Sequence, residues 1–358
     1  MPATHRILET KIQKLLNQCV QDRIAPAASC AVVLHHDWLP ELIAGEASPQ
    51  TFFDLASVTK LFTTVTALSL VDSKALELDA PIGRILPTYR QGQKATVTLR
   101  QLLTHTSGLP SQWRGWERSL NEGRGFERAR LVQDLLDTAL EAPPGTRFEY
   151  SCAGFNTIMV LAEHATGQPW AALVHDRVLA KLPTSGLTGT PRVEHCAPTE
   201  YQHALGRGLI QGIVHDEAAW SLGGLSGNAG MFATSGGLVA FGESLGRGLP
   251  GILSPGLAEE MWRSQLPEIL GNNFNPEDPA SGHSLGMRIN AQTWMGSHAQ
   301  EARGHGGFTG TSLLIDREHS LSIALLTNRV SPSRDGDDAT NLRKAVSDVV
   351  YSGENNPR

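Results

Sequence analysis

The pattern of apolar positions predicts regular elements near the start of the chain. Apolar residues recur at helical spacing over residues 5–22, which predicts an amphipathic helix. The small and β-branched run Ala27–Leu34 predicts a buried strand, and a short strand near Leu42–Ala44 is expected to pair with it. Residues 57–72 form a long, mostly apolar segment, which predicts a buried helix.

Helical spacing continues through the middle of the chain. It is strongest in four stretches, Thr98–His105, Glu127–Glu141, Asn156–Thr166 and Trp170–Leu179. Glycine and proline interrupt the remainder, at Pro143–Gly145 and from Gly206 through Gly237. The middle of the chain is therefore expected to be mainly helical.

The pattern changes again after residue 280. Short runs typical of strands follow, at Ser284–Ile289, Arg303–Gly307, Ser312–Asp316 and Leu321–Thr327. A last helix is predicted over Ala339–Tyr351. We predict an α+β fold in which residues 1–72 and 280–358 form a discontinuous sheet domain. Residues 73–279 would form a mainly helical domain inserted between the two parts of the sheet domain.

The composition constrains the fold little but argues against nucleic acid and membranes as partners. The 358 residues are 40% hydrophobic and 18% charged, with a formal net charge of −6, which is ordinary for a globular protein. This charge gives no electrostatic basis for binding nucleic acid or an anionic membrane. No apolar run reaches about 18 residues, so no membrane span is predicted. The polar start of the chain does not resemble a signal peptide, so a cytoplasmic location is expected.

Cysteine and histidine positions indicate no metal site. The four cysteines are too scattered for a zinc ribbon or a redox pair and are expected to be reduced thiols. They are Cys19, Cys30, Cys152 and Cys196. The stretch His195–His203 also contains Cys196 and Glu200, but the order of these residues matches no zinc template. We therefore expect no metal and no other cofactor.

Ser57 and Lys60 carry the first chemical signal. They lie three residues apart on a predicted helix, so their side chains share one face. A serine hydroxyl attacks well only when a base removes its proton, and a lysine serves as that base only when its pKa is lowered. The spacing alone arises by chance about once in a chain of this length. The alternative is a serine that caps the helix, with a solvated lysine one turn later.

Two further segments supply candidate partners. Tyr150 follows a proline–glycine turn just before a predicted helix, where its hydroxyl could face a cleft and carry a proton. The segment Arg303–Ser312 is rich in glycine, so its backbone can approach another group closely. Backbone N–H groups of Phe308 and Ser57 could then form an oxyanion hole. Taken alone, Tyr150 is better explained as a packing residue and the glycine-rich segment as a hairpin.

In their order along the chain, these segments resemble the penicillin-binding-protein-like serine hydrolases, which include class C β-lactamases, D,D-peptidases and related esterases. The resemblance rests on Ser57-x-x-Lys60, then Tyr150-Ser151, then His305-Gly306-Gly307. Further segments that look like family signatures are Leu99–Pro110, Ala197–Glu200, Gly212–Glu217, Leu222–Phe232 and Thr327–Arg329. Together they extend over roughly residues 25–350.

The resemblance implies a β-lactamase/transpeptidase-like fold, with an antiparallel sheet flanked by helices and an active site between the sheet and helical domains. It also implies that Ser57 forms an acyl-enzyme and that Lys60 and Tyr150 share the acid and base roles. The backbone N–H groups of Ser57 and Phe308 would hold the oxyanion. The substrate site would further be lined by His305, Gly306, Gly307 and Cys152.

Two positions depart from the family pattern. Cys152 stands where the tyrosine motif usually ends in an asparagine that helps to bind a substrate amide. His305 stands where β-lactamases often carry a lysine, and a histidine is only partly charged near neutral pH, so it anchors a substrate carboxylate less well. Arg303 could compensate from the same strand face, although an exposed arginine at the edge of the sheet is the favoured explanation. Both departures argue against efficient β-lactamase activity.

We therefore expect a serine hydrolase that acts on a small-molecule ester or amide, with no assigned oligomeric state. The alternative is a penicillin-binding D,D-peptidase or weak β-lactamase with a peptide-like substrate. A non-catalytic scaffold is a third hypothesis, supported only by Cys152. His105 and the His215–Glu217 run are expected to make structural hydrogen bonds around the cleft. Trp113 and Trp116 are expected to wall the acyl pocket or to pack nearby.

Overall fold

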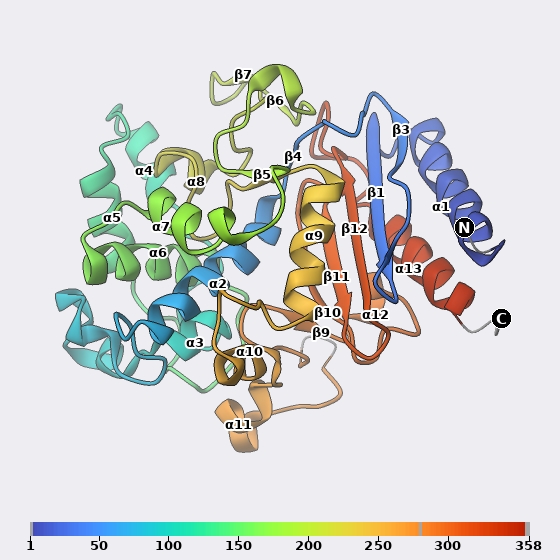
Figure 1. Cartoon of the computed structure of the whole chain (residues 1–358). Helices are drawn as coiled ribbons and strands as arrows, with labels where there is room; N and C mark the ends of the chain where they lie inside the picture. Colours follow the sequence, from blue (N-terminus) through green and yellow to red (C-terminus); the bar gives the residue numbers. More distant parts are fainter. Residues whose placement is uncertain (1–2, 279–280, 355–358) are drawn as a thin grey trace.

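A seven-stranded sheet forms the frame of the protein (Figure 1). The computed structural model describes residues 3–278 and 281–354. The strands follow the order β2-β1-β12-β11-β10-β9, with β3 also paired to β1, and every pairing is antiparallel. Their bounds are β1 Ala27–Leu34, β2 Asp37–Trp38, β3 Leu42–Gly45, β9 Arg288–Ile289, β10 Arg303–Gly306, β11 Ser312–Asp316 and β12 Leu321–Thr327.

The described residues also form thirteen α-helices and two small sheets. The helices are α1 Ala3–Gln21, α2 Thr59–Asp72, α3 Leu99–Leu103, α4 Gly115–Asn121, α5 Arg128–Asp137, α6 Cys152–Thr166, α7 Trp170–Arg177, α8 Glu217–Ser221, α9 Ser235–Gly246, α10 Pro255–Trp262, α11 Leu266–Leu270, α12 Gln292–Met295 and α13 Thr340–Glu354. The small sheets are β4-β8-β5, built from Phe53–Asp54, Phe232–Ala233 and Leu187–Thr188, and β6-β7, built from Tyr201–Gln202 and Gly208–Leu209.

Helices cover both faces of the main sheet. Helix α9 packs on the face toward the helical layer, and α1 and α13 cover the opposite face (Figure 1). Alternate residues of β1 therefore enter two different cores, Ala31 and Val33 on the α9 side and Cys30 and Val32 on the other. A strand buried on both faces is apolar throughout, which explains why Ala27–Leu34 shows no alternation.

Helix α2 lies in the centre of the helical layer. All of its residues from Thr59 to Leu70 are buried, and it packs against α6 and α7. Because the helix is surrounded on every side, its sequence carries apolar residues all round rather than on one stripe. The short 3₁₀ turn Ala56–Val58, which leads into α2, lies beside β10, so the sheet and the helical layer meet at this point.

Most predicted elements are present, and one predicted strand is largely wrong. Of the predicted strand Ser284–Ile289, only Arg288–Ile289 is extended, as β9. Gly286 adopts a φ of +72° and Ser284 N–H donates to Met287 O, so this stretch is a turn. Helix α9 comes from the predicted inserted region but packs on the sheet. The division into domains at residues 72 and 280 stays a prediction.

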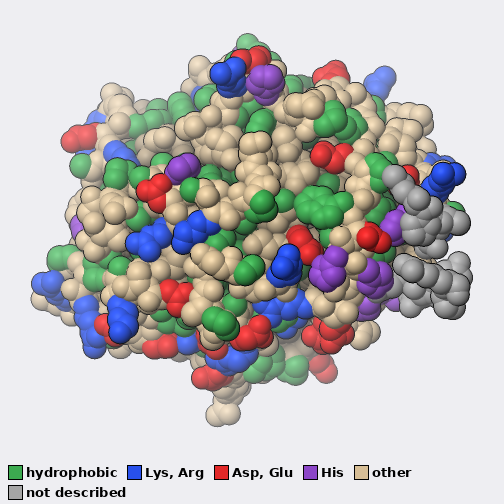
Figure 2. All heavy atoms as spheres, in the orientation of Figure 1, with side chains coloured by type: hydrophobic (Ala, Val, Ile, Leu, Met, Phe, Trp, Pro, Cys, Tyr) green, Lys and Arg blue, Asp and Glu red, His purple; other side chains and the backbone are tan. Residues whose placement is uncertain are grey.

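Charged side chains of both signs are mixed over the face shown in Figure 2. Within residues 3–278 and 281–354, no helix combines the length and the apolar composition that crossing a membrane requires.

Candidate active site

Ser57 lies where strand β4 meets helix α2. It is the middle residue of a short 3₁₀ turn, Ala56–Val58, that leads directly into α2. Ala56 has a φ of +45°, a conformation that costs a non-glycine residue about 1–3 kcal/mol. Two hydrogen bonds to the Asp54 carboxylate hold the turn, from Ala56 N–H at 2.8 Å and from His215 N–H at 2.6 Å. The Ser57 side chain is left half-buried at the wall of a cavity.

Lys60 is buried beside Ser57. Its side chain is fully inaccessible, so the alternative of a solvated lysine is wrong. Lys60 Nζ lies 3.0 Å from Ser57 Oγ, 3.3 Å from Asn228 O and 3.5 Å from Cys152 Sγ. Burial opposes a charge on Lys60, but the adjacent Cys152 and Tyr150 favour it, and the net effect raises the pKa of Lys60.

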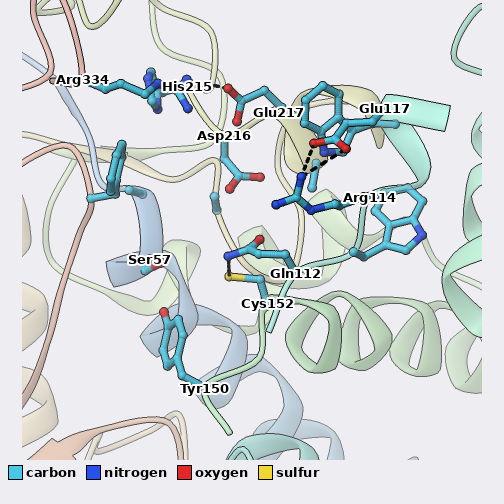
Figure 3. A pocket seen from close by; sticks show the side chains of 16 residues that line it. Ser57, Gln112, Arg114, Glu117, Tyr150, Cys152, His215, Asp216, Glu217 and Arg334 are labelled. Carbon is cyan, nitrogen blue, oxygen red and sulfur yellow. Dashed lines mark hydrogen bonds and ion pairs between the residues drawn. The ribbon is translucent and has the colours of Figure 1, made fainter. Parts of the chain in front are cut away.

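Tyr150 completes this group from the other side. It directly precedes the Ser151 cap of α6, and Lys60 Nζ lies 4.9 Å from the centre of its ring. Its hydroxyl points toward Ser57 (Figure 3), and both Ser57 and Lys60 influence its protonation. Burial raises the pKa of Tyr150, and the Lys60 ammonium group opposes part of that rise. At neutral pH the pair therefore rests as ammonium and phenol, and a base appears only when the pair loses a proton.

The loop after β10 is tied to the segment that precedes Ser57. The hydroxyl of Thr309 donates to Asp54 O at 2.6 Å, and that of Thr311 donates to Leu55 O at 3.0 Å. Gly307 is required for this approach, because a Cβ there would lie 2.4 Å from Leu55 O. No acceptor for the Phe308 N–H is found in the described part of the chain. This donor is therefore free to bind an oxygen at the site.

His305 is neutral in this site. It is buried, and its Nδ1 donates to Gly306 O at 2.8 Å. Burial, reinforced by the Lys60 ammonium group, holds the pKa of His305 well below its ordinary value. Arg303 is also buried and donates to the carbonyls of Trp262 and Glu301. The expected exposed position of Arg303 is therefore wrong, and neither side chain offers a free charge.

Two cavities meet at Ser57, Tyr150 and Phe308. The first, of about 440 Å³, is called here the acidic lobe (Figure 3). Its other side chains of interest are Gln112, Trp113, Arg114, Trp116, Glu117, Cys152, Asp216, Glu217 and Arg334. The second, of about 670 Å³, is called the arginine lobe. It is lined by Arg288, Arg329 and Arg343 together with His305, Gly306, Gly307, Asp278 and Asp338. The hydroxyl of Ser57 is thus reachable from two sides.

This arrangement can be compared with known proteins. The sequence profile described as Beta-lactamase matches residues 12–347. The chain belongs to the beta-lactamase family. It is 29% identical to the N-acetylmuramyl-L-alanine amidase of Bacillus subtilis (strain 168), over 78% of this chain and 68% of the relative. It is 28% identical to Esterase EstB of Burkholderia gladioli, over 96% of this chain and 95% of the relative.

The fold of this beta-lactamase family member is also that of solved structures. EstCE1, described as a hydrolase with promiscuous acyltransferase activity, superposes with a TM-score of 0.76 at 22% identity, over 98% of this chain and 100% of the other. The predicted family resemblance and the predicted α+β fold are thereby confirmed. The protein is a serine hydrolase of the beta-lactamase family, which confirms the predicted reaction class.

His105 makes structural hydrogen bonds beside the cleft, as the sequence predicted. Its Nδ1 accepts a hydrogen bond from Ser151 N–H at 3.0 Å, and its carbonyl accepts one from Glu149 N–H at 2.9 Å. Its ring lies 4.6 Å from that of Tyr150. Both peptide neighbours of Tyr150 are thus held by His105. Burial holds the pKa of His105 well below its ordinary value, which keeps Nδ1 available as an acceptor.

The other polar candidates of this family member have structural partners. His215 Nε2 lies 2.9 Å from Glu200 Oε2, and its N–H binds Asp54. Arg334 also binds Glu200 and, although burial favours the protonated acid, helps to lower the pKa of Glu200 to about 2. The described residues contain no cluster of side chains arranged to hold a metal. The sequence analysis did not identify the contacts made by the hydroxyls of Thr309 and Thr311 and by the carbonyl of Asn228. Their partners lie far away along the chain, so no local pattern indicates them.

Proposed function

We propose that this protein hydrolyses a small ester or amide through an acyl-enzyme on Ser57, with a small molecule rather than nucleic acid or a membrane as its partner. The observation that carries the proposal is the 3.0 Å contact between the buried Lys60 Nζ and Ser57 Oγ, at the junction of two open cavities. Tyr150 lies beside both groups. Nucleophile, proton carriers and room for both parts of a substrate are therefore together.

The reaction follows from these positions. Ser57 Oγ transfers its proton to the deprotonated form of the Lys60–Tyr150 pair and bonds to the acyl carbon. The negative oxygen that develops is held by the N–H groups of Ser57 and Phe308. The pair returns the proton to the leaving oxygen or nitrogen as the bond to the acyl carbon breaks. Water then attacks the acyl-enzyme with the same pair as base, and Ser57 Oγ leaves with its proton restored.

The direct test is the covalent intermediate. A p-nitrophenyl ester should release a burst of p-nitrophenol, and mass spectrometry should find the acyl group on the peptide that contains Ser57. A phosphonate probe should label the same residue, and Ser57→Ala should remove burst, label and turnover together. Turnover that survives in Ser57→Ala, or labelling elsewhere, contradicts the proposal. If the protein reacts with neither the ester nor the phosphonate probe, the non-catalytic scaffold becomes the favoured hypothesis.

A second candidate function is favoured by Arg288. Its guanidinium group stacks over the rings of Phe148 and Tyr150, at 5.4 and 6.0 Å from their centres. It lines the arginine lobe, where the Asp278 carboxylate also lies, and no hydrogen bond from its guanidinium group to the described residues is found. A free guanidinium group suits a carboxylate on the leaving group. This supports a penicillin-binding D,D-peptidase or weak β-lactamase, in which Arg288 supplies the charge that His305 lacks.

Penicillin labelling separates the two candidates. A peptidase of this kind should bind a fluorescent penicillin covalently at Ser57, and Arg288→Gln should slow that labelling more than it slows cleavage of p-nitrophenyl acetate. The ester carries no carboxylate, so it serves as the internal control. Equal slowing of both reactions, or no labelling of the native protein, would leave the ester or amide hydrolase.

We further propose a cytoplasmic location. All four cysteines are free and buried. Burial raises the pKa of Cys30 to about 12 and, as the largest effect, that of Cys19 to about 11, so both thiols stay protonated. Proteins without disulfides are typical of reducing compartments. Cell fractionation of the tagged full chain should place it in the cytoplasmic fraction, and recovery outside the cell membrane would contradict the assignment.

A further inference from the structure

Among the side chains that line the acidic lobe, carboxylates outnumber guanidinium groups. Its lining contains three carboxylates, Glu117, Asp216 and Glu217, and two guanidinium groups, Arg114 and Arg334. His215 also lines the lobe and is bound to Glu200, and the buried Lys60 ammonium group lies behind Ser57 and Cys152. Arg114 donates to Glu117 at 3.0 Å, and Arg334 donates to Glu217 at 2.5 Å. Each guanidinium group is therefore paired with a carboxylate of the lobe itself. Asp216 has no cationic partner within ion-pair distance among the described side chains.

Asp216 keeps one oxygen for the protein and presents the other to the cavity. Its Oδ1 accepts the Ala219 N–H at 2.8 Å and caps helix α8. In the described structure, no donor to its Oδ2 is found. Figure 3 shows the carboxylate projecting into the lobe in which Ser57 also lies. The capping contact fixes the side chain, so the free oxygen has a defined position before any substrate enters.

Aromatic side chains wall the same space. Trp113 and Trp116 line the lobe. Phe308 lies at the junction with the arginine lobe, where its ring already contacts the Arg329 guanidinium group at 4.3 Å, so the two indole rings are the aromatic groups available to a ligand. Trp113 is held in place by a hydrogen bond from its Nε1 to Asp134 at 2.7 Å. The face of an indole ring attracts a cation, and the attraction grows when water is excluded. A carboxylate oxygen without a partner and two indole rings that line one recess therefore favour a positive group.

We propose that the acidic lobe binds a cationic amine of the substrate and that Asp216 is the residue that selects it. The substrate is then an ester or amide that carries an ammonium group a few bonds from the reacting carbonyl. This assignment rests on the proposed function, because the amine is held while Ser57 attacks. An amine with N–H groups would also donate a charge-assisted hydrogen bond to Asp216 Oδ2.

Isosteric substrates test the charge alone. One pair is p-nitrophenyl 4-(trimethylammonio)butanoate and p-nitrophenyl 5,5-dimethylhexanoate, which place the charge in the acyl part. The other is acetylcholine and 3,3-dimethylbutyl acetate, which place it in the leaving group. In the pair whose charge enters the acidic lobe, kcat/KM should favour the cationic ester by about tenfold or more. The preference should shrink as salt is raised.

Asp216→Asn is the matched variant, because asparagine is an equally good helix cap and lacks the charge. It should bring the ratio of cationic to neutral kcat/KM close to one, with an unchanged melting temperature. The ratio within one variant cancels any general effect on the chemistry. Asp22→Asn removes the same charge at the end of α1, far from the lobe, and should leave the ratio as in the native protein. Asp216→Ser, which also caps, replaces the asparagine variant should that one fail to fold.

The outcomes separate this assignment from the proposed function. Native hydrolysis with a ratio near one in both pairs overturns the amine site alone. So does a preference that survives in both Asp216 variants. Absence of hydrolysis of every ester, together with no label on Ser57, contradicts the proposed function and this assignment with it.

Discussion

At the scale of single residues, the protons held by Lys60 and Tyr150 decide when the site can act. Both pKa values are raised, so the deprotonated pair is scarce at neutral pH and more abundant as pH rises. We expect kcat/KM for p-nitrophenyl acetate to increase from neutral pH into the alkaline range. Stopped-flow rates across that range measure the increase. Tyr150→Phe should lower the rate by about 10²–10⁴-fold, and a native rate that falls above neutral pH would contradict the scheme.

Cys152 offers a second test at this scale. Its Sγ contacts Lys60 Nζ at 3.5 Å and Gln112 Nε2 at 3.7 Å, and sulfur is a weak acceptor. Cys152→Asn supplies an amide that can bind the amide of a substrate, worth roughly fivefold in rate. We expect the variant to gain on amides and penicillins relative to p-nitrophenyl acetate. Cys152→Ser is the control of similar size, and an equal gain for it would show that polarity rather than the amide is responsible.

Residue identities alone predicted part of the site and missed its electrostatics. Ser57, Lys60 and Tyr150 lie together as their ordered motifs indicate. The charge of His305 was not predictable, because it depends on burial and on Lys60 nearby. The support that Asp54 gives to the Ser57 turn was equally hidden, because it reaches the backbone of a residue far along the chain. Side-chain types can be read from the sequence, whereas the desolvation that shifts their pKa values depends on how the molecule packs.

At the scale of elements, helix α9 shows why a pattern can hide a helix. Glycine lowers helix propensity by about 1 kcal/mol per residue, and α9 contains four glycines. Two of them permit close packing. A Cβ on Gly237 would lie 2.2 Å from Gly186 O, and one on Gly242 would lie 2.8 Å from Leu313 Cδ1. The same glycines that obscure the helix in the sequence let it lie against the loop and the sheet.

Substitutions in α9 separate these two effects. Gly237→Ala should lower the free energy of unfolding by about 1–3 kcal/mol or more, because the new methyl group meets backbone. Gly246→Ala places its Cβ 3.4 Å from Ile315 Cγ2 at the nearest. It should leave stability unchanged or raise it by up to about 1 kcal/mol. Urea denaturation measures both, and equal effects would show that propensity, not the close contact, dominates.

The loop after β10 is the second element that yields a prediction, because it positions the Phe308 N–H relative to Ser57. Thr309→Val keeps the shape of the side chain but removes its hydrogen bond to Asp54 O. We expect kcat to fall about tenfold with little change in KM, because the Phe308 N–H loses its fixed place relative to Ser57. Thr66→Val removes a comparable buried bond to Phe62 O within α2. If this control lowers kcat equally, the loop has no special part in positioning the donor.

At the scale of the whole molecule, two cores lie on opposite faces of the sheet. A substitution in the core away from the active site is therefore expected to lower stability without changing catalysis. Leu16 of α1 is fully buried in the core away from the site. Leu16→Ala should cost about 2–5 kcal/mol of unfolding free energy while kcat at a temperature well below melting stays unchanged. The neighbouring Leu15 is only partly buried, so Leu15→Ala should cost less. Thermal melting and ester turnover together measure both, and a matching loss of kcat would contradict the separation.

The main sheet was largely predictable, since its buried strands and terminal helices have clear periodicity. Strand β1 and the strands β11 and β12 match the predicted ranges. The predicted strand Ser284–Ile289 was too long, because Gly286 turns the chain just before β9. The order of the strands could not be predicted from the pattern of apolar residues either. Strand β1 pairs with β12 because the two apolar runs, far apart in the sequence, meet in space.

That pairing has a consequence for how the protein is made. Residues Ala28 and Thr327 face each other in the centre of the sheet. At ribosomal speeds of about 5–20 residues per second, the first of these strands emerges roughly half a minute before its neighbour exists. During translation, the apolar strand β1 therefore stays exposed on both faces and on the edge that later pairs with β12. Such a nascent chain is a natural client for chaperones that shield apolar segments, and its yield in a cell should depend on them more than its final stability suggests.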